Sequence, residues 1–264
     1  MARHMTTEGK RAQTKKKIRV NKKRIIYLIC VCIFIYSFLQ IIMWTSSNIK
    51  MNKQEKQLVK EIIREEQVTE NGEKINKIDF EKLKQINNEA VAWIEIPNTN
   101  INYPILQSKD NEYYLKKDIY KKYNSGGSIF MDCQNSNTFT DNNTVIFGHN
   151  LHLGKMFSEL QKIVKNELGT DITIKIYLEN KEKEYKVFSS YYSEPIKDPI
   201  NSNVKNTRQF IKNAKEKSQI DFNINPNEQD RLLTLSTCDN SGKKRILVHC
   251  VEVIEREVKE KQNE

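Results

Sequence analysis

The sequence predicts a mainly β (α+β) fold, in which a β domain with short peripheral helices follows one long apolar N-terminal helix. Two observations carry this prediction. Residues 25–44 contain no charged side chain. From Ala90 onward, short runs of β-branched and aromatic residues are separated by turn residues. About eight such runs are typical of a closed β-barrel or a β-sandwich. The length of 264 residues fits one medium domain with appendages.

The net charge of +10 is concentrated in an N-terminal tail. Residues 1–24 hold ten Lys/Arg and one Glu, whereas the rest of the chain holds 34 Lys/Arg and 33 Asp/Glu. A nucleic-acid-binding domain normally spreads its basic residues over a binding face. The charge distribution therefore argues against a nucleic-acid partner.

Residues 25–44 predict a transmembrane signal-anchor. Twenty helical residues span about 30 Å, which matches a bilayer core. Trp44 would lie at the outer interface, and the basic block Lys15–Arg24 marks residues 1–24 as a cytoplasmic tail. A cleaved signal peptide is the alternative, but Thr45-Ser46-Ser47 is a weak cleavage site and the apolar segment is long for one. We therefore expect an uncleaved, single-pass anchor with the remaining chain outside the cell.

Residues 45–75 are expected to form a membrane-proximal helical linker, because Leu58, Val59, Ile62 and Ile63 recur at helical spacing. Asn71-Gly72 suggests a turn. Phe80, Leu83 and Ile86 predict a second short helix with Asp79 as its N-cap. The main domain is placed at residues 76–264.

The predicted strands begin at Ala90, and each is bounded by Pro, Gly, Asn or Thr. They cover residues 90–96, 101–106, 128–131, 144–147, 171–178 and 186–192, followed by a pair of strands around Cys238. The alternation of Ile172, Ile174, Ile176 and Leu178 with polar residues is typical of a half-buried strand. Short helices are expected at about 155–165 and 204–217.

Cys238 is the candidate nucleophile. It ends the apolar run 232–238, and Arg245 opens the next run after a loop containing Asn240, Ser241 and Gly242. Such a hairpin places a thiol beside a fixed positive charge, which favours a reactive thiolate. The alternative is a small buried hydrophobic cysteine. Of the other cysteines, Cys30 and Cys32 lie in the apolar segment, and a Cys133–Cys250 disulfide is not expected.

A cysteine nucleophile usually has an imidazole partner. His4 lies in the tail and His152 in a polar loop. His249 is a genuine competitor, and by alternation it shares a strand face with Arg245, Leu247 and Val251. We favour His149 because it follows a strand through Gly148, so that, like Cys238, it sits at a strand end. We expect two such ends to meet at one rim of an antiparallel barrel.

The sequence predicts neither a metal nor another cofactor. Its acidic residues are dispersed, and His149, His152 and Cys238 lack the spacing of a structural zinc site. There is no phosphate-binding loop and no dinucleotide fingerprint.

Several motifs resemble the sortases, the Gram-positive cell-wall transpeptidases. Thr-Leu-Ser-Thr-Cys at 234–238 with Arg245 resembles the cysteine motif of that family, and Thr-Val-Ile-Phe-Gly-His-Asn at 144–150 resembles its histidine motif. Class B sortases in particular are similar at 93–97, 103–105, 110–115 and 127–132, and the resemblance spans about 76–255. Two departures are Phe147, where class B members often have Tyr, and the short loop between Cys238 and Arg245. Lys243 or Lys244 could replace Arg245, but the planar guanidinium fork favours the arginine.

The resemblance implies an eight-stranded sortase-type barrel that acts without a cofactor. Cys238 would attack a sorting signal of the Asn-Pro-x-Thr type and form a thioester, and His149 would exchange protons. Arg245 would stabilise the oxyanion. The neighbours Ser236 and Thr237 are expected to line the groove, and family analogy adds Asn111 and Leu115. The helix at 204–217 resembles the class B insertion. The implied partners are surface proteins carrying sorting signals and an amino group of a cell-wall precursor, with the enzyme anchored in the cell membrane.

Two other classes remain open at this point: a membrane-anchored cysteine protease or amidase that uses water as acceptor, and a non-catalytic β-barrel binding module. The sequence does not decide the exact sorting motif, the acceptor, or between surface-protein anchoring and pilus assembly.

Overall fold

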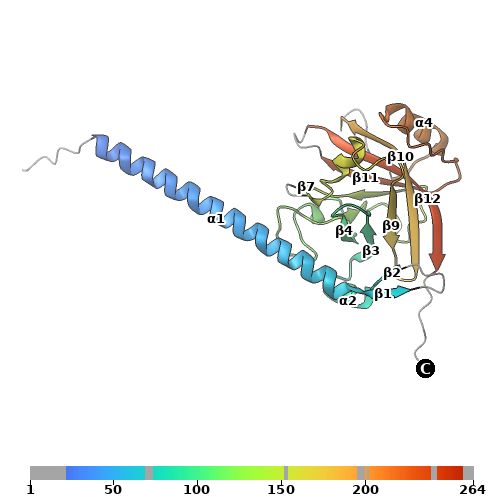
Figure 1. Ribbon diagram of the computed structural model, residues 1–264, viewed down its shortest axis with the longest axis horizontal. Coiled ribbons are helices and arrows are strands. Elements are labelled where there is room, and N and C mark those ends of the chain that lie inside the picture. The colour runs from blue at the N-terminus through green and yellow to red at the C-terminus, as the bar shows by residue number, and fades with distance from the viewer. Residues whose placement is uncertain are drawn as a thin grey trace, which may run out of the picture. The chain divides into compact units, whose positions relative to one another are not determined.

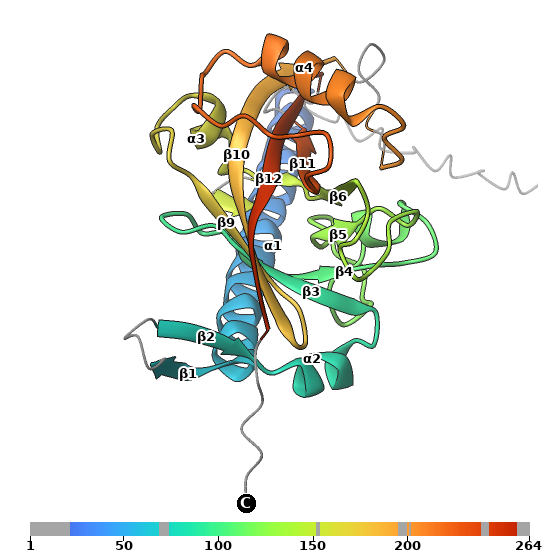
Figure 2. The same cartoon turned by 90° about the vertical axis from the view of Figure 1, so that its right-hand side faces the viewer.

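The computed structural model describes residues 22–68, 74–151, 154–194, 200, 202–238 and 243–257 (Figures 1 and 2). The chain divides after Lys56 into two compact units. The first contains most of the long helix α1, and the second contains the β-barrel with the end of α1.

Helix α1 spans Lys22–Ile62. Its part Lys22–Met43 is long and apolar enough to cross a membrane, and none of it is buried within the protein. This stretch contains nearly all of the predicted span at 25–44. It is therefore a candidate anchor.

The expected helical linker at 45–75 is only partly helical. α1 ends at Ile62, and the chain continues as strand β1 (Ile63–Val68), which pairs antiparallel with β2 (Lys74–Ile78). Leu58 and Ile62 are buried one helical turn apart, as their spacing predicts. The backbone amide of Asp79 then donates to the carbonyl of Ile62 at 2.9 Å, so this carbonyl is bonded to the returning chain beyond β2. The predicted turn at Asn71-Gly72 lies outside the described residues.

Helix α2 (Phe80–Ile86) confirms the predicted short helix. The side chain of Asp79 accepts a hydrogen bond from the backbone amide of Lys82 at 3.1 Å, as an N-cap does. Phe80 and Leu83 are buried and attach the helix to the barrel unit.

Eight strands form a closed barrel, so the barrel rather than the sandwich is correct. Around the barrel the order is β10-β12-β11-β6-β5-β4-β3-β9. The strands are β3 (Ala90–Glu95), β4 (Asn102–Leu106), β5 (Phe130–Met131), β6 (Asn143–Phe147), β9 (Thr173–Tyr177), β10 (Lys181–Ser193), β11 (Leu232–Cys238) and β12 (Arg245–Glu257). Most neighbours are antiparallel, but β4 pairs with β5 and β6 pairs with β11 in parallel.

Several predicted boundaries differ from the structure. β10 begins at Lys181 rather than 186, because charged residues at its start pair with β12; Lys183, for example, is buried with its Nζ 2.9 Å from Glu252. Helix α3 covers only Leu160–Val164, since Lys155–Met156 form strand β8 with β7 (Asn150–Leu151). Helix α4 covers Thr207–Lys217 and begins after an Asn206 cap.

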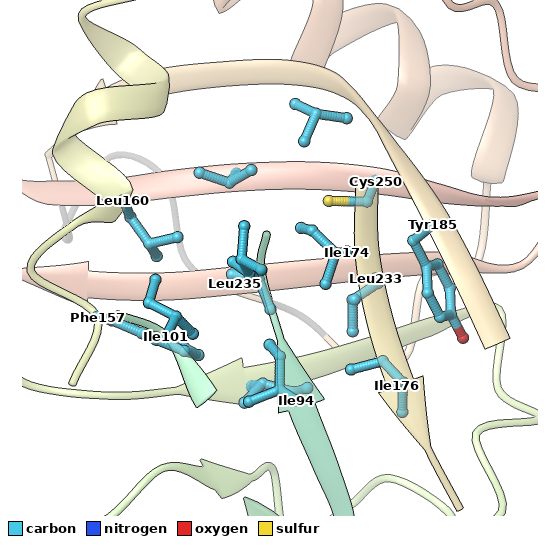
Figure 3. Packing of buried hydrophobic residues seen from close by; sticks show 14 of the residues in the cluster. Ile94, Ile101, Phe157, Leu160, Ile174, Ile176, Tyr185, Leu233, Leu235 and Cys250 are labelled. Carbon is cyan, nitrogen blue, oxygen red and sulfur yellow. The ribbon is translucent and has the colours of Figure 1, made fainter. Parts of the chain in front are cut away.

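Large aliphatic side chains from all sides of the barrel fill its interior (Figure 3). Strands β11 and β12 contribute every second residue, including Leu233, Leu235 and Cys250. Cys250 is a free thiol, and burial raises its pKa well above the ordinary value. Cys133 is also a free thiol, so Cys133 and Cys250 are not joined by a disulfide.

Two further apolar clusters lie outside the barrel interior. α4 covers the outer face of β10, β11 and β12 through Ile211 and Ala214. The other cluster joins Leu58 and Ile62 to Trp93 and to the loop between β4 and β5. These clusters hold the peripheral elements against the barrel and fix the strand ends that form the candidate site.

Candidate active site

The parallel pair β6 and β11 sets the position of His149 relative to Cys238. Phe147 and Ser236 are direct partners in the ladder, and the amide of Gly148 donates to the carbonyl of Ser236 at 3.1 Å. His149 and Cys238 each lie two residues further along. Their backbones therefore reach the same rim of the barrel at the same level. We expected two ends of an antiparallel barrel to meet there, whereas these are neighbouring parallel strands.

Arg245 lies on the other side of Cys238. The two residues are direct partners in the antiparallel pair β11–β12, so their backbones lie opposite each other in the ladder. Arg245 is half-buried, whereas Lys243 and Lys244 in the preceding loop are exposed. Strands β12, β11 and β6 are neighbours in the barrel wall (Figure 2). The ladder register thus arranges the backbones of Arg245, Cys238 and His149 side by side across β12, β11 and the end of β6.

The imidazole of His149 is held by a backbone carbonyl. Its Nε2 lies 2.8 Å from the oxygen of Leu115, which ends the short helix η1 (Tyr113–Leu115). A carbonyl can only accept a hydrogen bond, so Nε2 carries the proton in this arrangement. Among the groove residues that the resemblance implied, Leu115 is thus in direct contact with His149.

Gly148 allows the chain to pass into this position. A Cβ atom there would lie 2.4 Å from Ile129 Cδ1 and 2.8 Å from the Phe157 ring, which is closer than real contacts. The amide of Phe157 donates to the carbonyl of His149 at 3.0 Å and fixes its backbone from the following segment. Phe147 packs on Phe130 with ring centroids 5.4 Å apart, so this position supports the site by packing.

The other predicted groove residues have different surroundings. Ser236 is buried and shares a strand face with Cys238, whereas Thr237 is buried on the alternate face, and no described residue bonds its hydroxyl. The side-chain oxygen of Asn111 accepts from the backbone amide of Cys133 at 2.8 Å. Asn111 therefore braces the loop between β4 and β5.

His249 belongs to a packed face away from the rim. It is buried, with Nδ1 3.0 Å from Thr234 Oγ1 and Nε2 3.3 Å from Tyr191 Oη. The ring of Phe210 from α4 packs edge-on against it, with centroids 5.1 Å apart. As its alternation predicted, it shares this face with Leu247 and Val251. His4 and His152 lie outside the described residues.

Among the described residues, no group of three His, Cys, Asp or Glu side chains is placed to hold a metal ion. The site therefore consists of backbone-positioned Arg245, Cys238 and His149, with Leu115 behind the imidazole. No pattern in the sequence predicts the carbonyl contact of Leu115, because a backbone group carries no residue-type signature.

This arrangement matches a known family. The sequence model described as "Sortase domain" matches residues 94–253, which is more than half of the chain. The chain belongs to the sortase family. The strands that form the rim, β6, β11 and most of β12, fall in this range, so the sortase match covers the candidate site itself.

Characterised sortases of class B are similar over most of their length. Sortase B of Staphylococcus aureus is 36% identical over 177 residues, which cover 64% of this chain and 72% of that protein. Sortase B of Bacillus anthracis has a TM-score of 0.66 at 30% identity, covering 78% of this chain and 95% of that chain. A Staphylococcus aureus sortase B–substrate complex has a TM-score of 0.60 at 33% identity, covering 66% and 84%.

These similarities confirm the class B sortase fold that the motifs implied. Sortases are cysteine transpeptidases, and this chain is an enzyme of that type.

Proposed function

We propose that this sortase cleaves an Asn-Pro-x-Thr-type sorting signal after Thr and transfers the surface protein to an amino group of a cell-wall precursor. The observation that carries the proposal is the register of three neighbouring strand positions, Arg245, Cys238 and His149, at one rim. They supply a nucleophile, a proton carrier and a fixed cation, which acyl transfer requires.

In the first half-reaction, the Cys238 thiolate attacks the carbonyl carbon of the threonine. The C–S bond forms, the carbonyl becomes an oxyanion, and collapse of this intermediate breaks the C–N bond to the next residue. His149, as imidazolium, protonates the departing amine and becomes neutral. An imidazolium carries a proton on each ring nitrogen, so the ring can donate toward substrate while Nε2 remains bonded to the carbonyl of Leu115.

In the second half-reaction, the acceptor amine attacks the thioester. His149, now neutral, removes a proton from the amine, the C–N bond forms, and the Cys238 thiolate leaves. Proton transfer by a positioned imidazole typically contributes about 100- to 10,000-fold in rate.

Arg245 is the proposed oxyanion donor. Its position opposite Cys238 in the ladder supports this role, because a guanidinium is a planar and permanently charged hydrogen-bond donor. In the groove we assign Ser236 and Leu115 to direct substrate contact, since one shares the face of Cys238 and the other touches His149. We also assign Thr237 and Asn111 to the lining of the substrate groove, because their backbones lie beside those of residues in the groove.

The apolar part of α1 supports a membrane location. We propose that residues 1–24 are cytoplasmic, residues 25–44 cross the membrane and remain uncleaved, residues 45–75 form the membrane-proximal linker, and residues 76–264 form the extracellular catalytic domain. The partners would then be membrane-borne sorting-signal proteins and a lipid-linked or polymerised peptidoglycan amine.

The test uses the full chain in detergent with a sorting-signal peptide and increasing amounts of an amine acceptor. We expect a new amide product, identified by mass spectrometry, whose yield rises with the amine concentration. Hydrolysis alone at every amine concentration would instead assign a protease or amidase. Equal cleavage by the Cys238→Ala variant would leave only a binding role for this thiol.

A further inference from the structure

The loop between β4 and β5 (residues 107–129) carries a cluster of exposed apolar side chains. Among the described residues outside α1, five large apolar side chains are exposed, and four lie in this loop. Their exposed fractions are 37% for Tyr113, 36% for Leu115, 38% for Tyr120 and 74% for Tyr123. Such concentration in one loop is typical of an interaction surface, since isolated exposed apolar residues are usually scattered.

Lysines are interleaved with these aromatic residues. Residues 113–123 contain four lysines and one aspartate, a net charge of +3. Asp118 is occupied in a turn, where its Oδ1 accepts from the amides of Tyr120 and Lys122. Lys116, Lys121 and Lys122 are all exposed, and Lys121 pairs with Glu89 at 3.1 Å. We name the set Tyr113, Leu115, Lys116, Tyr120, Lys122 and Tyr123 the tyrosine–lysine surface.

Buried residues of the same loop support the tyrosine–lysine surface from beneath. Tyr114 is buried beneath it and donates its hydroxyl proton to Glu89 at 2.5 Å, while Asn87 Nδ2 donates to Tyr114 Oη at 2.9 Å. Ile119 is buried as well. The exposed tyrosines therefore project from a packed segment, and little conformational entropy is lost when they bind a partner.

These buried residues also place the surface near the point where the chain enters the barrel unit. Tyr114 and Ile119 belong to the same apolar cluster as Leu58 and Ile62, the last buried residues of α1. Thirteen residues separate the end of the candidate membrane span at Met43 from Gln57, where the barrel unit begins. Thirteen residues reach at most about 45 Å even when fully extended, so a chain anchored through α1 tethers the barrel unit within a few nanometres of the bilayer.

We propose that the tyrosine–lysine surface docks on anionic lipid headgroups of the membrane that holds α1. Tyrosine rings have an apolar body and a polar tip, which suits the headgroup region. Lysines near an anionic leaflet are each attracted strongly enough to shift the docking equilibrium about fivefold. The inner side of the same loop presents the Leu115 carbonyl to His149, so docking turns the active-site rim toward membrane-borne substrates. The docking is independent of whether Cys238 forms a thioester.

The experiment places one copy of the full chain in each lipid nanodisc and follows deuterium uptake of peptides within 113–124. With phosphatidylglycerol we expect at least threefold slower uptake than with phosphatidylcholine, and no change in peptides from α4. About 0.5 M salt should remove the difference, because it shortens the Debye length to a few ångströms.

Paired variants decide the assignment. Lys116→Gln with Lys122→Gln should weaken docking about 25-fold and abolish the lipid-dependent protection. The exposed lysines Lys165 and Lys205 provide a matched control with the same charge change, and Lys165→Gln with Lys205→Gln should retain the protection. Tyr120→Ser with Tyr123→Ser should reduce it without changing the charge.

Four results would overturn the proposal. Uptake could be equal in the two lipids, or the protection could persist after loss of Lys116 and Lys122. Protection by a soluble polyanion in phosphatidylcholine discs, with none from phosphatidylglycerol, would assign the surface to an anionic wall polymer. Protection that requires two copies per disc would assign it to self-association.

Discussion

His149 and His249 lie on neighbouring parts of one barrel wall, yet their surroundings differ in kind. His149 follows the end of β6, and its ring is held by the carbonyl of Leu115 in an exposed contact at the rim. His249 lies within β12, where Thr234, Tyr191 and the ring of Phe210 enclose it. An imidazole that must exchange protons with a substrate needs access and freedom to turn, whereas a fully enclosed one mainly stabilises the fold.

The difference follows from strand geometry. A residue inside a strand is fixed by ladder bonds on both sides, and its neighbours on the same face pack against it. A residue just beyond a strand keeps the precise position of the ladder but loses the covering neighbours. This explains why the candidate site consists of strand ends and why His249, only four residues from Arg245, lies outside it.

Substitution of His149 should cause the largest loss of transpeptidation rate. His149→Gln should reduce transpeptidation at least about 1000-fold, because the amide cannot exchange a proton near neutral pH. The midpoint of urea unfolding should move little, since the His149 side chain is only half-buried and substitutions away from a packed core typically change the free energy of unfolding by at most about 0.5 kcal/mol. Rates with a fluorogenic sorting peptide and an unfolding curve measure both quantities. A variant that keeps most of its rate would remove His149 from the mechanism.

Substitution of Arg245 should cause the next largest loss of transpeptidation rate. Arg245→Lys keeps the charge but loses the planar fork, and we expect the rate to fall about 100-fold. Lys244→Gln is the matched control in the adjacent loop and should remain within about twofold of the parent enzyme. A loss of activity in Lys244→Gln as large as that in Arg245→Lys would contradict the assignment of the oxyanion role to Arg245 alone.

His249 should show the opposite pattern. His249→Leu removes the hydrogen bonds to Thr234 and Tyr191 within a packed face and should lower the free energy of unfolding by about 1–3 kcal/mol. The rate per folded enzyme should change less than about threefold. Loss of rate with unchanged stability would show that our distinction between the two histidines is wrong.

Thr234→Val sharpens the same distinction with a nearly isosteric change. The hydroxyl lies 2.8 Å from Asn143 Oδ1 and 3.0 Å from His249 Nδ1, and its removal should lower the free energy of unfolding by about 1 kcal/mol. Calorimetry should detect a lower melting temperature with unaltered kinetics. An unchanged melting temperature would contradict a structural role for the Thr234–His249 contact.

The smallest expected effect is on the pH dependence of stability, and it comes from Glu255 near the end of β12 that lies away from the candidate site. A hydrogen bond from Lys181 and the charge of Lys183 hold the pKa of Glu255 below its ordinary value. A lowered folded-state pKa contributes stability above the unfolded-state pKa, and this contribution is lost as pH falls through the folded-state pKa. The urea midpoint should therefore decline below about pH 4.5, and less steeply in Glu255→Gln. Identical slopes in both proteins would refute this contribution.

The sequence was informative where periodicity and motif order carry the signal. The alternation on β9 and β12, the Asp79 cap and the eight barrel strands follow from local patterns, and the family follows from motifs on either side of the site. Long-range pairing was not readable, and β6 and β11 proved to be parallel. The charged start of β10 was missed because Lys183 is buried only through its partner Glu252. The helix expected beyond Ile62 became a strand because the returning chain bonds the Ile62 carbonyl.

The central claim is that the sulfur of Cys238 is the nucleophile to which the acyl part of the substrate becomes attached. Its backbone is in register with those of His149 and Arg245. Intact-mass spectrometry of the full chain incubated with a sorting-signal peptide library, followed by peptide mapping, tests it most directly. The account predicts a transient mass increase equal to the acyl part of the peptide, located on Cys238, absent in Cys238→Ala and retained in Cys133→Ala. Cleavage without any adduct on Cys238, or an adduct on another residue, would contradict it.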